Sequence, residues 1–584
     1  MIRRLFRQMM LTQIVSAMTV TLCMLIDSAV IARHLGVNAV AAYGFAAPVV
    51  LAFAAPGAMI SAGVQVVCGR AMGSGDREGT DACFTLALTL SLAIAAVGTA
   101  LVLCFSGPLC TLLGAGVPGS GDPAYILTKR YLTGMILGVP AFLPVQILVP
   151  FMQMAGRRRR LVVAVLLMTA SDVAFDLLNV YVFHGGMFGM GAASTLSYYI
   201  ALVTGGAYFL RRDCLFHFRR RGLRADVLRP ILKEGVPTVV NQLSLVLLVL
   251  FLNHTLSRIG GNMAVAAYSV ISTLSNLCYA FGSGIGSVAL MLAAVFYTDE
   301  DRASLHALTA VACRSAVVVL SAVTLAVLLG ARPVVGVFLA DKTKTMALAV
   351  RGLRLFALCL VPSALNTTLK FFYQGTGRVR LMELISVLQN FALPALAALA
   401  LGPLFAVTGV WLCFLCGEGA TLLLICLYVW HKNARVSIDA ESFALLPPGF
   451  GADANDCYLC SVQSIPDAAA ASEGAMAFCR AHGRDGRMSA LVALCIEEIT
   501  VNIIRYGFGM DSRRHNIDVR LILREGESLI RIRDDCANFD PVHYLELHRQ
   551  DDPGAHLGIR MVMAAARDAS YLNSYGLNNL TLRL

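Results

Sequence analysis

Charged residues are scarce in this sequence. Only 14% of the 584 residues are Asp, Glu, Lys or Arg, whereas 57% are hydrophobic and the mean hydropathy is +0.71. Soluble globular domains carry roughly a quarter of their residues as charged side chains. The composition therefore excludes an ordinary soluble protein and predicts that most of the chain lies in lipid.

Several functional patterns are missing as well. No basic patch interleaved with aromatic residues occurs, which excludes nucleic acid as a partner. The one close cysteine pair, Cys457 and Cys460, has no second pair to complete a zinc site. The 17 cysteines are therefore interpreted as small buried side chains in a reducing compartment. A Walker-type phosphate-binding loop is also missing, which excludes transport driven by a P-loop ATPase.

Long apolar runs, in contrast, are abundant. About twenty apolar residues are needed for a helix to cross the ~30 Å hydrocarbon core of a bilayer. The sequence predicts twelve such spans, with the first left uncleaved because no small-residue cleavage site follows it. They lie near residues 11–33, 47–69, 83–106, 126–152, 161–183, 190–210, 230–256, 265–295, 306–330, 347–373, 382–401 and 406–430.

The net positive charge is confined to this apolar part of the chain. Residues 1–430 carry 31 Lys and Arg against 16 Asp and Glu, whereas residues 431–584 carry 16 against 20. With a cytosolic N-terminus, the arginines at 157–160 and between Arg211 and Arg229 fall in cytosolic loops, as the positive-inside rule requires. We therefore predict a multi-pass protein of the cytoplasmic membrane, embedded in its lipid bilayer, with both termini in the cytosol.

The apolar part repeats itself once. "LGVNAVAAYGF" at 35–45 recurs as "IGGNMAVAAYSV" at 259–270, and "MQMAGRRR" at 152–159 recurs as "YQGTGRVR" at 373–380. Because each copy holds six predicted spans, both copies insert in the same orientation and form two bundles around an axis along the membrane normal. Proteins that merely duplicated for size repeat too, so the duplication favours a transporter without proving one.

Three stretches carry a resemblance to a known family. They are "IDSAVIARHLGVNAVAAYGFAAP", "PGAMISAGVQVVCGRAMGSGD" and "DLLNVYVFHGGMFGMGAAST". Together with the duplicated spans, they resemble the multidrug and toxic compound extrusion (MATE) family over roughly residues 5–432. The resemblance implies a mostly α-helical membrane protein of two six-helix lobes. It also implies export of small organic molecules, cationic ones among them, in exchange for Na⁺ or H⁺.

Four carboxylates lie deep inside the predicted spans, away from their first few residues: Asp27, Asp172, Asp176 and Glu418. An ionised carboxylate at the bilayer centre costs about 2.5–3.5 kcal/mol on insertion scales, so each requires a function or a partner. Asp172 and Asp176 are one helical turn apart, and Asn179 continues the same stripe. The alternative interpretation is that these polar groups simply hydrogen-bond to neighbouring helices.

We interpret Asp27, Asp172, Asp176 and Asn179, with Thr195 as a further oxygen ligand, as a cation-coupling site. The resemblance implies this role for Asp27 and Asp176, which match acidic positions of family members that couple in the N-terminal lobe. Asp172 stands where those members often have Asn, which leaves the choice of Na⁺ or H⁺ open.

The second copy lacks a comparable set. In its seventh predicted span the stretch "VPTVVNQLSLVLLVLFLNHTL" contains no carboxylate, and neither does "VPSALNTTLKFFYQ" in the tenth, although some family members carry acidic residues in these spans. Lys370 lies in the tenth span and would repel a cation. We therefore expect no coupling through the second lobe.

From about residue 455 the pattern changes to short strands and amphipathic helices. "YLCSVQS" predicts a strand, 467–483 and 489–506 predict helices, and "NIDVRLILREGESLIRIRDD" predicts a hairpin around "REGES". On the second helix, Glu498 and Asn502 are one turn apart, on the side opposite an apolar stripe.

The order of motifs in this tail resembles a GHKL-type ATPase domain, a small α/β sandwich, and in particular the anti-sigma-factor serine kinases. The motifs are "EEITVNIIRYGF", "RDDCANFDP", "GAHLGIRMV" and the closing "YGLNNLTLRL". The resemblance assigns Glu498 to catalysis, Asn502 to a Mg²⁺ ion of Mg-ATP and Asp534 to the adenine. Gly554 and Gly558 would hold the phosphates at a helix start. An ordinary solvated helix face is the alternative interpretation.

Two departures affect this assignment. Cys536 occupies the glycine position after the adenine-binding aspartate, and His556 replaces a glycine of the phosphate lid. Both add a side chain where backbone must approach the nucleotide closely. We therefore expect nucleotide binding more firmly than turnover.

These inferences divide the chain and give two functional hypotheses. The predicted domains are an N-terminal lobe (1–210), a basic inter-lobe loop (211–229), a C-terminal lobe (230–432), a linker (433–454) and the GHKL-type domain (455–584). The first hypothesis is a cation-coupled antiporter with a nucleotide-binding regulatory domain. The second is a transporter-like sensor that controls a serine kinase acting on a soluble signalling protein.

Overall fold

The computed structural model describes most of the chain. The described residues are 2–73, 77–117, 121–155, 158–209, 214, 216–219, 225–298, 300–339, 344–433, 439–447, 449–452, 454–509, 515–524, 526–536, 539–541, 544–545, 557–574 and 577–584. The chain separates into two compact units, which are described one at a time. The helical unit comprises 6–293 and 308–445, and the tail unit comprises 1–5, 294–307 and 446–584.

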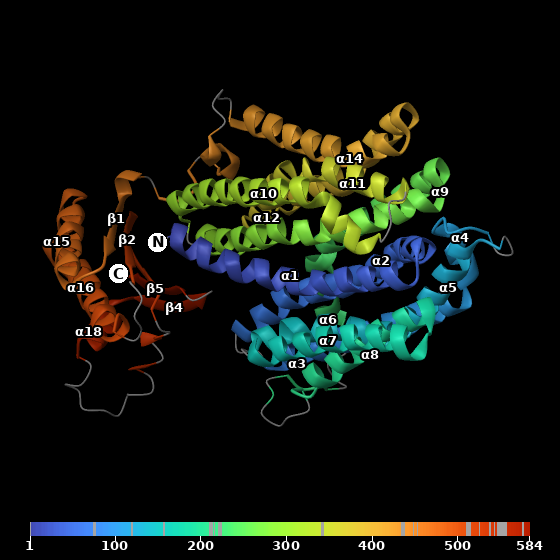
Figure 1. Cartoon of the computed structure of the whole chain (residues 1–584). Coiled ribbons are helices and arrows are strands. Elements are labelled where there is room, and N and C mark those ends of the chain that lie inside the picture. The colour runs from blue at the N-terminus through green and yellow to red at the C-terminus, as the bar shows by residue number, and fades with distance from the viewer. Residues whose placement is uncertain are drawn as a thin grey trace. The chain divides into compact units, whose positions relative to one another are not determined.

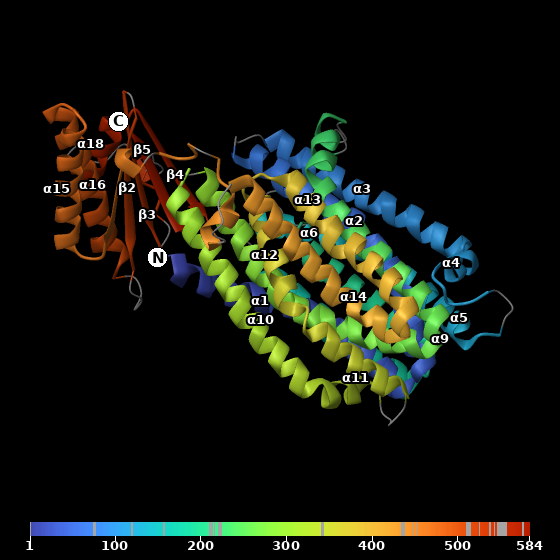
Figure 2. The same cartoon turned by 90° about the horizontal axis from the view of Figure 1, so that it is seen from above.

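Helices make up the helical unit (Figures 1 and 2). In the first half of the chain they are α1 (Ile2–His34), α2 (Val37–Gly73), α3 (Arg77–Cys104), α4 (Ser106–Leu112), α5 (Pro123–Ile136), α6 (Val139–Met154), α7 (Arg158–Leu178) and α8 (Gly186–Gly206). In the second half they are α9 (Ala225–Thr298), α10 (Arg302–Phe338), α11 (Lys344–Ala357), α12 (Leu360–Gly375), α13 (Val379–Val387) and α14 (Leu393–Asn433). Short 3-10 turns, η4 (Ala440–Ala444) and η5 (Ala454–Asp456), follow.

Two of these helices are interrupted, and two pairs are bent. The helical dihedral angles break at Gly261 in α9 and at Ala406 in α14, both with positive φ. The pairs α5–α6 and α11–α12 bend by 53° and 50°. Pro140 and Pro362 lie just beyond the two bends, at matching places in the sequence repeat. Proline removes a backbone donor and disfavours a helical residue before it, which explains a bend at these points.

Each half also contains a π-helical turn. η1 (Asn179–Phe183) continues α7, and η3 (Leu388–Ala392) continues α13 into α14. A π turn places one surplus residue in a helix and is frequent at functional sites. Both turns carry amide side chains, Asn179 in η1 and Gln389 in η3, whose hydrogen bonds are described below.

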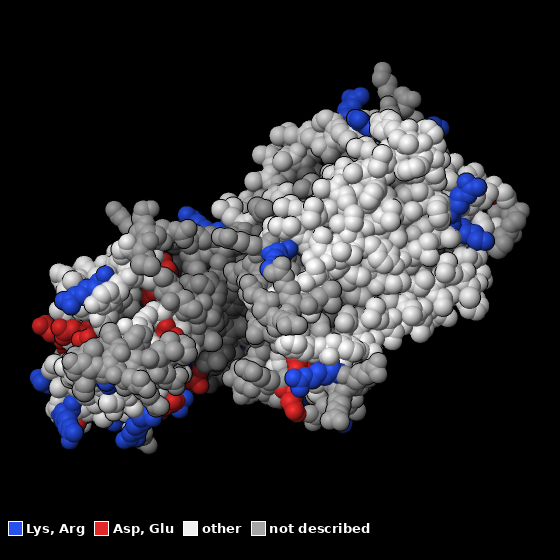
Figure 3. Space-filling model, turned by 90° about the horizontal axis from the view of Figure 1, so that it is seen from below, with Lys and Arg blue, Asp and Glu red and all other residues white. Residues whose placement is uncertain are grey.

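The length and composition of the helices fit a membrane. Among the described residues, seven helices are long and apolar enough to cross a bilayer, or up to nine if each bent pair is one span. The segment Asp226–Tyr297 has 72 residues and Val379–Asn433 has 55, each enough for two crossings divided at the breaks just described. On the face shown in Figure 3, the helical unit presents a broad area with few charged side chains. The exact number of twelve spans stays a prediction.

Helices within each half pack against one another. In the first half α2, α3, α5, α6, α7 and α8 contact one another, and in the second half α11, α12, α13 and α14 do. The halves also meet: the Asn253 side chain donates a hydrogen bond to the Gly44 carbonyl at 3.0 Å, and Gly44 lies against Ser269. Small residues at such positions let helices approach closely.

The tail unit is built on a five-stranded antiparallel sheet. Its strands are β1 (Cys457–Val462), β2 (Ile517–Arg524), β3 (Glu527–Asp534), β4 (Asp568–Ser574) and β5 (Leu577–Arg583), in the order β1-β2-β3-β5-β4. Helices α15 (Ile465–Ala481), α16 (Gly486–Gly507) and α18 (Leu557–Ala565) lie on one face of the sheet (Figure 1). The predicted first strand, hairpin and closing strand are confirmed, whereas β4 was not predicted.

Local sequence explains the helices of this unit. Ser464 and Asp485 cap α15 and α16 by accepting hydrogen bonds from the backbone N–H groups of Asp467 and Met488. The stripe of Val492, Ile496 and Ile499 is buried against the sheet, where it meets the alternating apolar residues of β2 and β3. The predicted apolar side of α16 is therefore confirmed.

The sheet also packs against residues 294–307, which belong to the same unit. Arg520 of β2 and Arg533 of β3 are buried there and form ion pairs with Asp301, at 3.4 Å and 3.7 Å. The Arg533 guanidinium lies over the Phe296 ring, 4.8 Å from its centroid. One acidic side chain thus holds two adjacent strands to this segment.

A prediction concerns the close packing of α5 and α8. A Cβ atom on Gly191 would lie 2.5 Å from the Tyr131 carbonyl oxygen, whereas one on Gly205, also buried in α8, would meet only side chains at 3.7 Å or more. We expect Gly191→Ala to lower the apparent melting temperature of the detergent-solubilised protein, because overpacking costs about 1–3 kcal/mol. Gly205→Ala should leave that temperature unchanged or raise it. Equal melting temperatures for the two variants would contradict the packing of α5 against α8.

Candidate functional sites

A cavity of about 420 Å³ lies inside the helical unit. Its volume is in the range of small-molecule sites, about 300–1,000 Å³. Both halves of the chain line it. The first half contributes Asp27, Tyr43 and Tyr131, and the second half contributes Asn241, Lys370 and Glu418, among others. The cavity is therefore a candidate site for a small molecule with polar groups.

Three of the predicted coupling residues come together beside this cavity. Asp27 of α1 lies within interaction distance of both Asp172 and Asp176 of α7, and all three are buried. Asp172 also interacts with Ser194 and Ser197 of α8. Asp27 lines the cavity, whereas the two aspartates of α7 lie outside its lining. Asp27 therefore connects the cavity to the buried pair.

Asp176 is the most enclosed member of the three. Its side chain is 0% exposed, and neither carboxylate oxygen accepts a hydrogen bond from the residues that the structure describes. Its interaction partners are other carboxylates, those of Asp172 and Asp27. Adjacent carboxylates in a poorly hydrated interior cannot all be ionised without a compensating charge. A proton or a small metal cation would supply that compensation.

The other two predicted coupling residues are engaged with backbone. The Asn179 amide accepts a hydrogen bond from the Gly185 N–H and donates one to the Gly186 carbonyl, both at 3.1 Å. The Thr195 hydroxyl donates to the Gly134 and Met135 carbonyls, at 2.8 Å and 3.3 Å. These contacts hold the turn before α8 and the α5–α8 contact. A role for either side chain in cation binding stays a prediction.

Glu418 of α14 has a different environment. Its carboxylate accepts hydrogen bonds from the Asn366 amide, at 2.8 Å, and from the Gln389 amide, at 3.1 Å and 3.3 Å. It is buried and lines the cavity. Neutral amide donors thus compensate this carboxylate, which fits the alternative interpretation that it is a hydrogen-bonded packing residue.

Sequence reasoning gave two cavity residues too little weight. Lys370 was treated only as an obstacle to cations, and Asn241 was not considered, yet both line the cavity. The Lys370 ammonium donates to the Asn241 amide oxygen at 3.2 Å. A lysine in the middle of a predicted span was the available signal, because a charge at that depth requires a reason.

In the tail unit, α16 and α18 bring the predicted nucleotide-site residues together. The Asn502 amide donates a hydrogen bond to Glu498 Oε1 at 3.0 Å. The Glu498 carboxylate lies against Gly558, where a Cβ atom would clash with it. A side chain at 558 would therefore displace the Glu498 carboxylate from its present position. Gly554 and His556 lie outside the described residues.

The end of β3 forms the next part of this site. The buried Asp534 carboxylate accepts hydrogen bonds from the Asn578 amide at 2.8 Å and from the Cys536 N–H at 2.9 Å, both at Oδ1. The side chain of Cys536 lies against Gly507 at the end of α16, where a Cβ atom would be 3.0 Å from it. The absence of a side chain at 507 therefore accommodates the unexpected cysteine.

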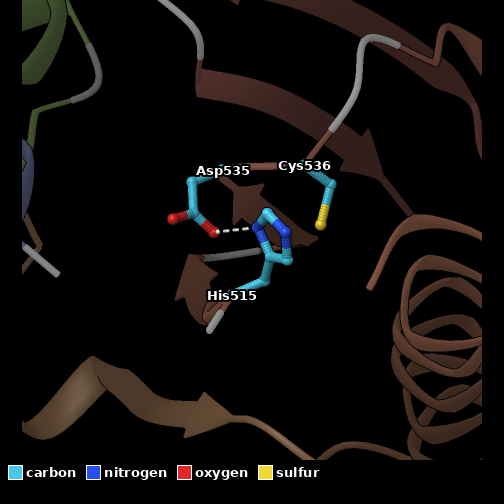
Figure 4. Close-up of side chains that lie close together, drawn as sticks. All are labelled: His515, Asp535 and Cys536. Atoms are coloured by element: carbon cyan, nitrogen blue, oxygen red, sulfur yellow. Dashed lines mark hydrogen bonds and ion pairs between the residues drawn. The ribbon is translucent and has the colours of Figure 1, made fainter. Parts of the chain in front are cut away.

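A second cluster adjoins this strand end (Figure 4). The His515 Nδ1 lies 3.2 Å from Asp535 Oδ1, and the Cys536 sulfur points toward the same space. The ligand atoms of the three residues lie within 4.8 Å of one another. Imidazole, thiolate and carboxylate are the ligands that zinc takes in proteins, so this trio has the donor set of a partial zinc site.

The family comparison decides what kind of protein this is. The MatE family model matches the chain twice, over residues 13–180 and 237–398, which is more than half of its length. The chain belongs to the MATE family. One match to each half agrees with the internal repeat seen in the sequence. The chain is thus a multi-pass membrane protein of the MATE multidrug transporter family.

Solved MATE structures share its fold. An inward-facing multidrug resistance MATE family transporter of the MOP superfamily has a TM-score of 0.65 at 21% identity, covering 70% of this chain and 93% of that one. An outward-facing one has a TM-score of 0.60 at 20% identity, covering 72% and 94%. A MOP superfamily transporter from Pyrococcus furiosus, described as having a binding pocket of reverse polarity, has a TM-score of 0.62 at 20% identity, covering 74% and 96%. No curated protein matches.

A prediction follows from the environment of Asp534. Burial raises the pKa of the Asp534 carboxyl above its ordinary value of 3.8, against the opposing hydrogen bond from Asn578. The folded tail therefore binds this proton more tightly than the unfolded chain does, so its stability should fall as the pH rises from 3.8 through the raised pKa. Hydrogen exchange of the β3 and β5 amides in the full chain, corrected for intrinsic exchange rates, measures this stability.

The isosteric variant Asp534→Asn should lose this pH dependence and be more stable than the wild type at neutral pH. Asp535→Asn is the matched control, because the neighbouring carboxylate is less buried and hydrogen-bonds to His515 instead. Identical pH profiles for the wild type and Asp534→Asn would contradict the raised pKa.

Proposed function

We propose that this MATE protein is a cation-coupled antiporter that exports small organic molecules across the cytoplasmic membrane. Its twelve spans would form two six-helix lobes, residues 1–210 and 230–432, joined by the cytosolic loop 211–229, with both termini in the cytosol. The observation that carries the proposal is the buried cluster of Asp27, Asp172 and Asp176 beside a cavity that Asp27 also lines.

The cluster provides a reason for a cation to bind. Desolvation and mutual repulsion destabilise three ionised carboxylates in one buried place. A proton on one of them, or Na⁺ held by their hard oxygen atoms, would remove part of the negative charge. Both ions suit the oxygen atoms present, so the coupling ion is left open between H⁺ and Na⁺.

Asp27 provides the link from the cation to the exported molecule. Because it belongs to the cluster and to the cavity wall, neutralising it also removes a negative charge from the cavity. A bound cationic group would then lose its partner and be released. Binding of the coupling ion and of the substrate would therefore be mutually unfavourable, which is the thermodynamic requirement for exchange.

Reconstituted transport tests this proposal. The full chain in proteoliposomes should move rhodamine 110, a zwitterionic dye, or its methyl ester rhodamine 123, a cation, when a pH gradient or a Na⁺ gradient is imposed. We expect Asp27→Asn and Asp176→Asn to reduce dye movement to the level of empty liposomes, because the coupling charge is lost. Comparing the two gradients identifies the ion.

Glu78→Gln is the matched control, since Glu78 is an exposed carboxylate in the first turn of α3. It should transport at the wild-type rate. Full gradient-driven transport by both aspartate variants would exclude coupling through this cluster.

For the tail we propose a nucleotide-binding regulatory domain, residues 455–584, joined by the linker 433–454. The observation that favours it is the convergence of Glu498, Asn502 and Gly558 on one edge of the unit, with the buried Asp534 at the end of β3. Mg-ATP, when bound, would supply phosphates and a metal ion. Asn502 donates through its NH₂ group to Glu498, which leaves its amide oxygen for a cation.

Asp534 also fits an adenine contact. Its buried carboxylate is fixed at Oδ1 by the two hydrogen bonds described above, and the Cys536 side chain interacts with it as well. A carboxylate oxygen in that position can accept a hydrogen bond from an exocyclic amino group. Glu498 would orient or deprotonate the attacking hydroxyl of water or of a partner serine.

Calorimetric titration of the full chain with Mg-ATP tests the tail. We expect binding by the wild type, loss of at least about tenfold in affinity for Asp534→Asn and Asn502→Ala, and retained binding without turnover for Glu498→Gln. Glu497→Gln is the control, because that adjacent carboxylate accepts from Ser472 on α15 instead. No heat up to millimolar Mg-ATP would remove the nucleotide site.

The alternative function remains a membrane sensor that controls a serine kinase acting on a soluble signalling protein. A dye-transport assay distinguishes the regulated transporter from the membrane sensor. If Glu498→Gln changes dye movement, the tail regulates the transporter. If dye movement is unchanged while a serine of a soluble partner is no longer phosphorylated, the signalling function is the better description.

A further inference from the structure

Lys370 places a positive side chain in the wall of the cavity. It lies on α12, is 5% exposed and lines the cavity together with Asn241, Asn390 and Phe371. Burying an ammonium group is costly unless the charge is compensated. The proposed exporter of organic molecules, as developed so far, gives this charge no function.

The compensation within the protein is small. An ammonium group has three N–H donors. Among the residues that the structure describes, Lys370 forms one hydrogen bond, to the Asn241 amide oxygen at 3.2 Å, and no ion pair. Asn390 also donates to that oxygen, at 2.9 Å, so Lys370 shares its acceptor. The Phe371 ring, 5.9 Å away, adds only a weak cation–π contact.

The acidic residue that acts electrostatically on Lys370 is already hydrogen-bonded. Glu418 interacts electrostatically with Lys370, but its two oxygens are held by the Asn366 and Gln389 amides rather than by the lysine. Those amides come from α12 and η3, and they fix the carboxylate without neutralising Lys370 in a direct ion pair. The lysine therefore retains donors for a group inside the cavity.

The opposite charge is provided by the other half of the chain. Asp27, from α1, lines the same cavity near Tyr43, which it influences electrostatically. The Tyr43 and Tyr131 rings make an edge-to-face contact with centroids 5.5 Å apart, and both line the cavity. The cavity thus presents a carboxylate and aromatic rings from one half, and an ammonium group and amides from the other.

We propose that the exported molecules are zwitterions whose anionic group binds Lys370 and whose cationic group binds at Asp27. A carboxylate or phosphate on the substrate would accept the remaining N–H donors of Lys370, with Asn241 and Asn390 positioned beside it. A purely cationic molecule would meet the repulsion of the lysine. This inference rests on the proposed export function and names the chemical class of its substrates.

Dye binding to the purified full chain tests the proposal. Rhodamine 110 has a free carboxylate, and rhodamine 123 is the same molecule with that group methylated. Fluorescence polarisation should give at least about tenfold tighter binding of rhodamine 110 to the wild type. Lys370→Met should weaken rhodamine 110 binding by about tenfold or more and leave rhodamine 123 binding unchanged or tighter. Lys370→Arg should retain the preference.

The wild-type comparison stands even if Lys370→Met fails to fold. A wild-type protein that does not bind rhodamine 110 more tightly than rhodamine 123 would overturn the assignment, as would an unchanged preference in folded Lys370→Met. The gradient-driven assay separates this inference from the antiport. If the protein transports dye along an ion gradient but does not prefer rhodamine 110 over rhodamine 123, only the zwitterion class is refuted. If it shows that preference but no gradient-driven transport, only the ion coupling is refuted.

Discussion

The need to compensate ionised groups in a poorly hydrated interior governs this protein. The two halves of the helical unit compensate their ionised groups in different ways. In the first half, Asp27, Asp172 and Asp176 lie together, and Asp176 receives no hydrogen bond from the described residues. In the second half, the Asn366 and Gln389 amides satisfy Glu418, while Lys370 shares one amide oxygen with Asn390. This contrast underlies our proposals that one half takes up a cation and that the other binds an anionic group.

Much of the fold could be predicted from the sequence because apolar length and periodicity determine it. The apolar runs correspond to the long helices, and the duplicated motifs to two matches of one family model. In the tail, alternating residues predicted β2 and β3. The edge strand β4, "DASYLNS", was missed because its few apolar residues give no alternation, and its pairing with β5 depends on contacts within the folded sheet.

Helical spacing could predict the site only where its residues are close in sequence, whereas Asp27 joined the predicted site through the resemblance to the MATE family. Asp172 and Asp176 share a helix face, and Glu498 and Asn502 share another, so helical spacing was sufficient. Helical spacing also placed Asn179 in the predicted cation site. However, a π turn begins at Asn179, and the Asn179 amide hydrogen-bonds to the backbone of Gly185 and Gly186. The amides around Glu418 and Lys370 come from distant segments, which no local pattern brings together. The fit of Cys536 against Gly507 likewise depends on tertiary packing.

The two π turns, η1 and η3, lie in corresponding helices of the two halves but at different depths, because η1 follows the 21 residues of α7 and η3 follows the 9 residues of α13. Conversion of a π turn to regular α-helix would remove the surplus residue from that turn. The residues that follow the turn would then rotate about the helix axis by about 100° and shift along it by roughly 1.5 Å. In η3 that rotation would turn Gln389 and Asn390 away from Glu418 and Asn241, the groups they now hold. The two π turns thus place amide side chains at positions that an uninterrupted α-helix would not give them.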